Sequence, residues 1–247
     1  MDKQFQFLIE DEGNVSVKFD FYKIKEETRH YSINIYNIEE DIRSLLYKGN
    51  QIYLTYRGVS RCISFSIIEY SLISTKETFD SIKVKVSLSS CLNVFADNFY
   101  AELFYSWKNN DKQYRWDNLG VRKRKLWLNA CSSIKNTGNK HLISNTIYLH
   151  FKGLKTMLDF YCHFGDRCLG YKGYLGSNLD ALDDMLLDLD SKSIEKTIFY
   201  LYDLDIFRSK MTQTREAKKY NINYVDEILK IFKEHKINYK LAKSVRF

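Results

Sequence analysis

Apolar and polar residues alternate along several segments of the first half of the chain. Val15, Val17, Phe19 and Phe21 are separated by polar residues, which is the period-two pattern of a strand with one buried face. Further strands are predicted in the same way at Tyr31–Tyr36, Gln51–Arg57, Arg61–Ile68, Ser81–Ser87 and Tyr100–Trp107. Residues 1–140 are therefore expected to form a β-rich domain, whose antiparallel sheet has one solvated face and forms a barrel or a sandwich.

Two segments of this half depart from the alternation. Asn37 can cap a helix, Glu40 stands at the capping-box position and Gly49 can end it, so a helix is expected after the second of these strands. Ser132–Lys140 is rich in Ser, Asn and Gly, and we expect the domain boundary there.

Strand and helix patterns alternate beyond this boundary. Strands are expected at Thr146–Phe151, at Thr197–Tyr202 and from Asn238, with a helix near Leu154–His163. This order favours a small three-stranded parallel sheet with covering helices in a second α/β domain, residues 144–247. The chain as a whole is thus predicted to be of the α+β class.

A glycine-punctuated loop leads into a short helix of this second domain. Asn178 is a good N-cap, because its side-chain oxygen can accept a hydrogen bond from a free amide of the first turn. Leu179, Leu182 and Leu186 recur at helical spacing and predict a buried stripe. Gly173 and Gly176 lack the spacing of a dinucleotide-binding loop, and we expect both to supply positive φ angles. The loop and helix therefore form one structured unit.

The same helix has an acidic side. Asp180, Asp184 and Asp188 fall at successive i+4 steps and line up with one another. Stacked like charges repel, so such a helix either has this repulsion offset by its dipole or presents the carboxylates to a basic partner. A solvated helix face is the alternative interpretation of such a run.

This helix carries a family resemblance. The pattern Tyr-x-Gly-x-Asn-Leu-Asp-Ala-Leu-x-Asp-x-Leu, from Tyr174 to Leu186, resembles the signature of the barstar family of ribonuclease inhibitors. Ile228–Lys236 is similar to the late helix of that family, in which an acidic residue, here Glu234, follows a Phe-basic pair. The resemblance covers Ser144 to Phe247. It implies a protein that occludes the active site of a toxic nuclease, most simply a ribonuclease, without turnover, metal or cofactor.

The resemblance also implies roles for individual residues. Asp184 is the central carboxylate in the place of substrate phosphates, Asp180 supports it, and Glu234 adds an acid from the second helix. Tyr174 packs against the catalytic centre of the nuclease; the alternative is a loop tyrosine half buried beside Leu179. The expected partner-binding residues are Tyr174, Gly176, Asn178, Asp180, Asp183, Asp184, Asp188 and Glu234.

The chain departs from the family pattern at two positions. Asp183 stands where an aromatic residue commonly precedes the central acid, and Leu175 stands where a second tyrosine is usual. These departures concern the choice of partner more than the fold. They imply a nuclease surface different from that of the best-known ribonuclease of this system.

Composition and charge limit the remaining possibilities. Formal net charge is +7, yet Asn178–Asp190 holds five aspartates and no base, so net charge misdescribes this surface. No apolar run approaches the roughly 20 residues of a membrane helix. The first residues do not form a signal peptide and the five cysteines have no metal-type spacing, so a reducing cytoplasm is expected. The family resemblance implies that this cytoplasm is bacterial. The histidines are scattered, and no catalytic motif is present, so we do not expect an enzyme.

One segment of the first half supports an alternative function. Trp107–Trp127 interleaves aromatic and basic residues, a combination that can bind single-stranded nucleic acid. The alternative is a solvated hairpin whose aromatic residues return to the core. We favour this alternative, because a run of adjacent Lys and Arg residues does not by itself define the geometry of a binding site. The second hypothesis for the chain is nonetheless a nucleic-acid-binding protein that uses its basic N-terminal half, with the barstar-like domain as a docking module. Under the first hypothesis, direct nucleic-acid binding is not expected.

Overall fold

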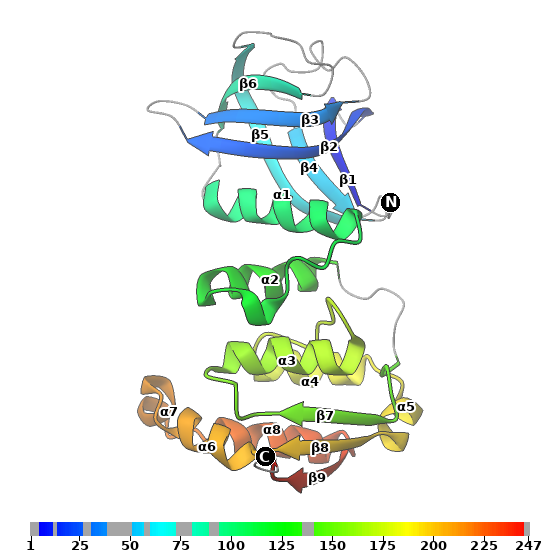
Figure 1. The fold of residues 1–247 in the computed structure, drawn as a ribbon, viewed down its shortest axis with the longest axis vertical. Helices are drawn as coiled ribbons and strands as arrows, with labels where there is room; N and C mark the ends of the chain where they lie inside the picture. The colour runs from blue at the N-terminus through cyan, green and yellow to red at the C-terminus, as the bar shows by residue number, and fades with distance from the viewer. Residues whose placement is uncertain are drawn as a thin grey trace. The chain divides into compact units, whose positions relative to one another are not determined.

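The computed structural model describes residues 5–11, 14–26, 31–38, 51–56, 60–72, 81–88, 94–134 and 141–244. The chain divides into two compact units, Met1–Ile134 and Lys135–Phe247, and each is described by itself. The helix expected between Asn37 and Gly49 lies outside the described residues, apart from its first two positions, which end a strand. The fold is mixed α+β, as predicted (Figure 1).

The first unit contains a closed antiparallel barrel with strand order β1-β2-β3-β6-β5-β4 (Figure 1). Side chains such as Phe7, Ile9, Ile33 and Ile35 are fully buried. The prediction of an antiparallel, β-rich first half is confirmed; β1 is a strand that the alternation had not indicated. The strands are β1 (Phe5–Asp11), β2 (Asn14–Glu26), β3 (Tyr31–Ile38), β4 (Gln51–Tyr56), β5 (Ser60–Leu72) and β6 (Ser81–Leu88).

The strand predicted at Tyr100–Trp107 is wrong, because this segment belongs to helix α1 (Val94–Lys108). Phe99, Leu103 and Trp107 are buried at steps of four, so the burial follows a helical period. Helix α1 packs against β2, and the side chain of Asn98 bonds to both backbone groups of Ile24. The helix therefore lies against the barrel wall.

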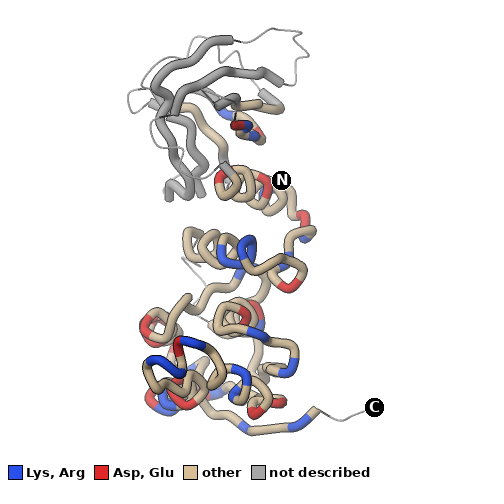
Figure 2. The backbone as a smooth tube through the Cα atoms, turned by 90° about the vertical axis from the view of Figure 1, so that its left-hand side faces the viewer, with Lys and Arg blue, Asp and Glu red and all other residues tan. Residues whose placement is uncertain are grey.

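The basic segment is helical, so the predicted hairpin is also wrong. It contains a short 3-10 helix (Trp116–Asn118) and α2 (Val121–Ser133), whose Lys and Arg residues are marked in Figure 2. The rings of Trp107 and Trp127 meet edge to face at 5.2 Å, and both are buried. These two aromatic residues return to the core, and they are not available for stacking on bases.

The cations of this segment also have partners within the first unit. The Arg124 guanidinium donates to the carbonyl oxygens of Trp116 at 3.1 Å and Leu119 at 2.8 Å. The Arg122 guanidinium lies 4.5 Å from the ring centroid of Phe95. These contacts give part of the basic run a structural role.

The second unit is a parallel sheet of order β7-β8-β9 with helices, as predicted. Its strands follow one another across the sheet in sequence order, and right-handed crossovers in such a sheet place the connecting helices on one face. Its elements are β7 (Thr146–His150), α3 (Met157–Leu169), α4 (Leu179–Leu187), α5 (Ser191–Lys196), β8 (Ile198–Tyr202), α6 (Leu204–Thr212), α7 (Arg215–Tyr220), α8 (Tyr224–Glu234) and β9 (Asn238–Ala242).

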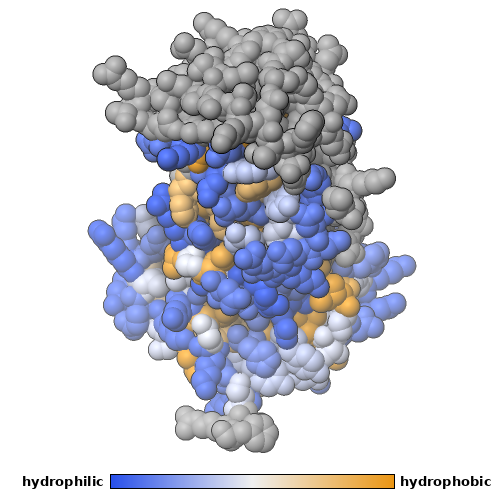
Figure 3. All heavy atoms as spheres, turned by 45° about the horizontal axis from the view of Figure 1, so that its top comes forward, coloured by the Kyte–Doolittle hydropathy of each residue, from blue (hydrophilic) through white to orange (hydrophobic). Residues whose placement is uncertain are grey.

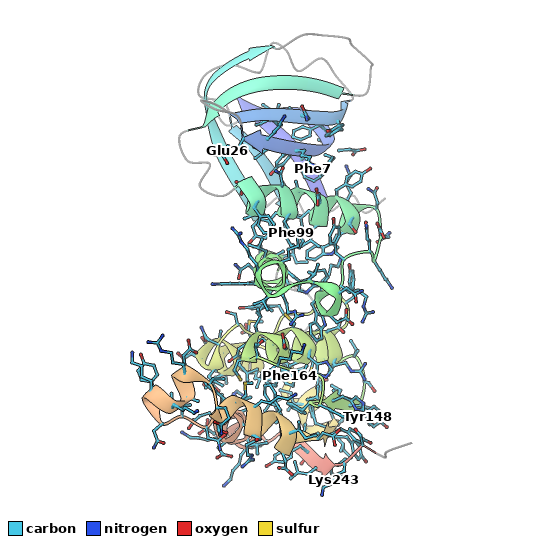
Figure 4. The ribbon with its side chains drawn as sticks, turned by 60° about the vertical axis from the view of Figure 1, so that its left-hand side comes forward. Phe7, Glu26, Phe99, Tyr148, Phe164 and Lys243 are labelled. Atoms are coloured by element: carbon cyan, nitrogen blue, oxygen red, sulfur yellow. The ribbon has the colours of Figure 1, made fainter. Side chains whose placement is uncertain are left out.

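A cluster of phenylalanines fills the space between the sheet and these helices. Phe164 of α3 lies 5.4 Å from Phe232 of α8 and 6.2 Å from Phe199 of β8, measured between ring centroids. All three side chains are fully buried, and Phe164 is labelled in Figure 4. One face of the sheet thus packs against the hydrophobic core of this unit.

The outer edge of β7 is covered by side chains of α3. The backbone N–H of His150 donates to His163 Nε2 at 3.2 Å, and Arg167 Nε donates to the carbonyl oxygen of Tyr148 at 3.0 Å. Helix α3 therefore uses its inner face for the core and two polar side chains for the strand edge.

The described surface is mostly hydrophilic on the side shown in Figure 3, with small, separate hydrophobic areas. Among the described helices, none is both long enough and apolar enough to cross a membrane.

Candidate functional site

Two glycines shape the loop before α4, for different reasons. Gly176 has φ of 96°, and a Cβ built there would lie 2.5 Å from the amide nitrogen of Leu182. The expected positive φ is confirmed at this position. At Gly173 the expectation is wrong, because this residue does not have a positive φ. A Cβ at Gly173 would instead lie 2.2 Å from the carbonyl oxygen of Gly165, so this glycine permits close contact between the loop and α3.

Helix α4 begins and packs as the sequence predicts. Asn178 is its N-cap, and its side-chain oxygen accepts a hydrogen bond from the amide of Ala181 at 2.7 Å. Leu182 and Leu186 are buried, and Leu179 is half-buried. The apolar stripe therefore holds the helix against the domain, and the acidic side faces outward.

The three aspartates of the i+4 series are exposed. Asp180 and Asp184 lie within α4, and Asp188 is its C-cap. The charge of Asp180 also acts on the interior, because burial, the hydroxyl of Tyr224 and then Asp180 together raise the pKa of Tyr161 above its usual value. The helix thus presents a negative surface, and within the described part of the chain Asp180, Asp184 and Asp188 form no salt bridge.

Asp183 has a partner within the domain. Its Oδ1 lies 2.6 Å from Nε2 of His235, the C-cap of α8, and the His235 side chain is only 10% exposed. Glu234, the last residue of α8, is exposed and directly precedes this histidine. The contact joins α4 to the end of α8 and brings the two acidic elements together.

Tyr174 lies mostly inside the domain, with 8% of its surface exposed and its hydroxyl 3.5 Å from Ser177 Oγ. Its burial agrees better with the loop-tyrosine alternative than with a projecting aromatic anchor. Leu175 is fully buried, so the position of the second family tyrosine has a core role here. The loop contributes its shape to the site more than its side chains.

Sequence reasoning missed two residues of this surface. Leu187 is 70% exposed and stands three residues after Asp184, on the same side of the helix. The sequence did indicate Leu187, because it is an apolar residue that lies outside the i, i+3, i+7 stripe. His235 had no recognisable signal, because its contact joins residues 52 positions apart.

The described parts of the chain contain neither a metal site nor a reactive thiol. No group of three or more His, Cys, Asp or Glu side chains there could hold a metal ion. Cys131, Cys162 and Cys168 are buried, and burial raises the pKa of Cys168 well above its usual value. A high pKa keeps a thiol protonated and unreactive.

One of three comparisons with known proteins gave a match. Residues 144–244 match the family model described as Barstar (barnase inhibitor). Neither the comparison with curated proteins nor that with solved structures gave a match. Inhibitors of this family are not enzymes, in agreement with the expectation from the sequence. The C-terminal part of the chain is therefore a domain of the barstar family of barnase-type ribonuclease inhibitors.

Proposed function

We propose that the domain at residues 144–247 binds a toxic ribonuclease and occludes its active site with the acidic side of α4. The observation that carries this proposal is the division of the helix into two sides. Leu182 and Leu186 are buried, whereas Asp180 and Asp184 are exposed on a helix whose start is capped. A helix held in this way can present carboxylates to a partner without ordering its backbone at the moment of binding.

The chemistry of a ribonuclease site suits such a surface. Sites that cleave RNA use cationic side chains to bind and stabilise phosphate charge. A carboxylate can form charge-assisted, often bidentate, hydrogen bonds with these groups. Asp184 is our proposed central carboxylate, with Asp180, Asp188 and Glu234 around it. The opposite charges also accelerate encounter.

The other predicted residues take supporting roles in this proposal. Gly176 and Asn178 fix the loop and the start of the helix, and Asp183 acts through His235 to hold α4 against α8. The buried side chain of Tyr174 holds the loop against the interior of the domain. Leu187 supplies exposed apolar area beside the acids.

The biological setting that we propose is immunity against a bacterial toxin. An inhibitor that occupies the active site protects a cell that makes the toxin, or a neighbour of that cell, within the cytoplasm. Residues 1–140 are proposed to be a separate domain of this immunity protein.

The test is a binding and inhibition assay with a ribonuclease toxin, to be sought among the products of the neighbouring genes. Asp184→Ala should weaken binding by at least about 30-fold, the size of an interface hot spot, while the circular dichroism spectrum stays unchanged. Asp205→Ala is the matched control, because Asp205 is an exposed aspartate in the first turn of α6. If Asp184→Ala binds as tightly as Asp205→Ala, the proposed surface is wrong.

A further inference from the structure

The second face of the β7-β8-β9 sheet is a separate candidate site. Side chains alternate across a sheet, and those of Ile147, Leu149, Phe199 and Leu201 are buried on the side of the helices. The intervening positions of the same strands are exposed or half-buried. In Figure 1 the three strands lie in front of α8, and within this unit no described helix or strand covers the near side. Parallel sheets are normally covered on both faces, so this one is unusual.

Aromatic residues form two rows across this open face. Tyr148 and Tyr200 are register neighbours, with ring centroids 5.5 Å apart and planes 29° apart. His150 and Tyr202 form the next row, with centroids 4.7 Å apart and planes 18° apart. Tyr148 is 45% exposed, and Figure 4 shows it at the margin of the unit. The outer ring face of Tyr148 is therefore open to a planar ligand.

The charges around the rows favour an anionic ligand. Lys240 is the register neighbour of Tyr200 on β9, and its Nζ lies 5.8 Å from the centroid of that ring. Arg167 is exposed at the opposite edge, beside Tyr148. None of the strand positions on this face is Asp or Glu. Asp203, which directly follows β8, accepts hydrogen bonds from the Ser244 amide and hydroxyl.

We propose that this face, defined by Tyr148, His150, Tyr200, Tyr202 and Lys240, binds single-stranded RNA. Aromatic rings on a sheet stack unpaired bases, and flanking cations contact the phosphates. The open outer face of Tyr148 gives a stacking position for one base, and the strands beside it, about 4.8 Å apart, give contacts for the nucleotides next to that base. Among the described residues, no side chain bonds to the hydroxyls of Tyr148, Tyr200 and Tyr202, so they are available to ribose 2′-hydroxyls. This proposal is independent of α4, which contacts α8 in the layer of helices.

The test is fluorescence anisotropy of the full chain with an eight-nucleotide uridine RNA at low salt. Tyr148→Ala should weaken binding by about 5-fold or more, since one base loses its stacking partner. Tyr220→Ala should have no effect, because Tyr220 is an even more exposed tyrosine next to a lysine but lies on α7. Lys240→Gln should reduce the salt dependence by about one phosphate contact, whereas Lys219→Gln should not.

Several results would overturn the proposal. One is the absence of saturable binding by the parent chain, and another is equal loss in Tyr148→Ala and Tyr220→Ala. If Arg122→Gln removes binding and Tyr148→Ala does not, the RNA site lies in the first unit. Equal or tighter binding of the matching thymidine DNA contradicts the choice of RNA. If Tyr148→Ala converts an oligomer to a monomer in sedimentation, the face is an interface between copies of the chain.

Discussion

Asp183 Oδ1 and His235 Nε2 lie 2.6 Å apart and join α4 to the end of α8. Their side chains are 45% and 10% exposed, so the contact lies at the border between solvent and core. The family resemblance seen in the sequence led us to expect an aromatic residue at this position. Here a polar contact occupies it and holds the acidic helix in place, which gives Asp183 a role within the domain.

The first prediction concerns this contact. Asp183→Ala and His235→Ala should each lower the free energy of unfolding by about 1 kcal/mol, the usual contribution of a partly exposed charged hydrogen bond. Because the two residues contact each other, the double variant should lose clearly less than the sum of the single losses. Urea unfolding of the four proteins measures this coupling. Strictly additive losses would show that the pair does not stabilise the domain.

The second prediction concerns the loop glycine. Gly176→Ala should destabilise the domain by about 1–3 kcal/mol, because alanine tolerates a φ of 96° poorly and its Cβ would clash with the backbone of Leu182. Gly153→Ala is the matched control, since a Cβ there meets nothing within 4 Å. Its free energy of unfolding should stay within about 0.5 kcal/mol of the parent. Thermal unfolding of both variants measures this difference in stability. Equal stability of the two variants would contradict a strained conformation at position 176.

The third prediction concerns encounter with the nuclease. The association rate constant should fall steeply as ionic strength rises from about 0.01 to 0.15 M, because the Debye length shortens from about 30 to 8 Å. Stopped-flow mixing at several salt concentrations measures the slope. A double Asp180→Asn, Asp188→Asn variant should show a shallower slope. A rate independent of salt in the parent protein would rule out steering by this surface.

The fourth prediction concerns pH. The Ser244 hydroxyl and amide bond to Asp203 and lower the pKa of its carboxyl below 3.8. A carboxyl with a lowered folded-state pKa stabilises the fold above its unfolded-state pKa, and this contribution is lost as pH falls through the folded-state value. Ser244→Ala should therefore move the pKa of Asp203 upward, as measured by carboxyl titration in NMR spectra. An unchanged pKa would show that these bonds do not form in solution.

The sequence predicted elements whose signal is local. The cap at Asn178, the positive φ at Gly176 and the buried stripe of α4 each follow from residues within one or two turns. The strand prediction for Tyr100–Trp107 failed because a segment of eight residues rich in aromatic side chains fits a strand as well as a helix. Only the longer span from Val94 shows the helical period, with Phe99, Leu103 and Trp107 on the buried side.

Contacts between distant segments could not be predicted. The burial of Tyr174 depends on the close approach of Gly173 to Gly165, and a tyrosine in a glycine-rich loop has no local feature that distinguishes a buried ring from a projecting one. The same holds for His235, whose partner is fixed only when α4 and α8 pack together. Similarly, the open sheet face follows from the order of the strands and not from their composition.

The contacts of His163 and Arg167 with the β7 edge have a consequence for self-association. An additional strand can join the sheet beside β7 only if both contacts are broken. Indefinite stacking of copies through their sheets needs two receptive edges on every copy. Blocking one edge of the β7-β8-β9 sheet therefore limits such pairing to two copies, so the domain can be present at high concentration without building fibrils through this sheet.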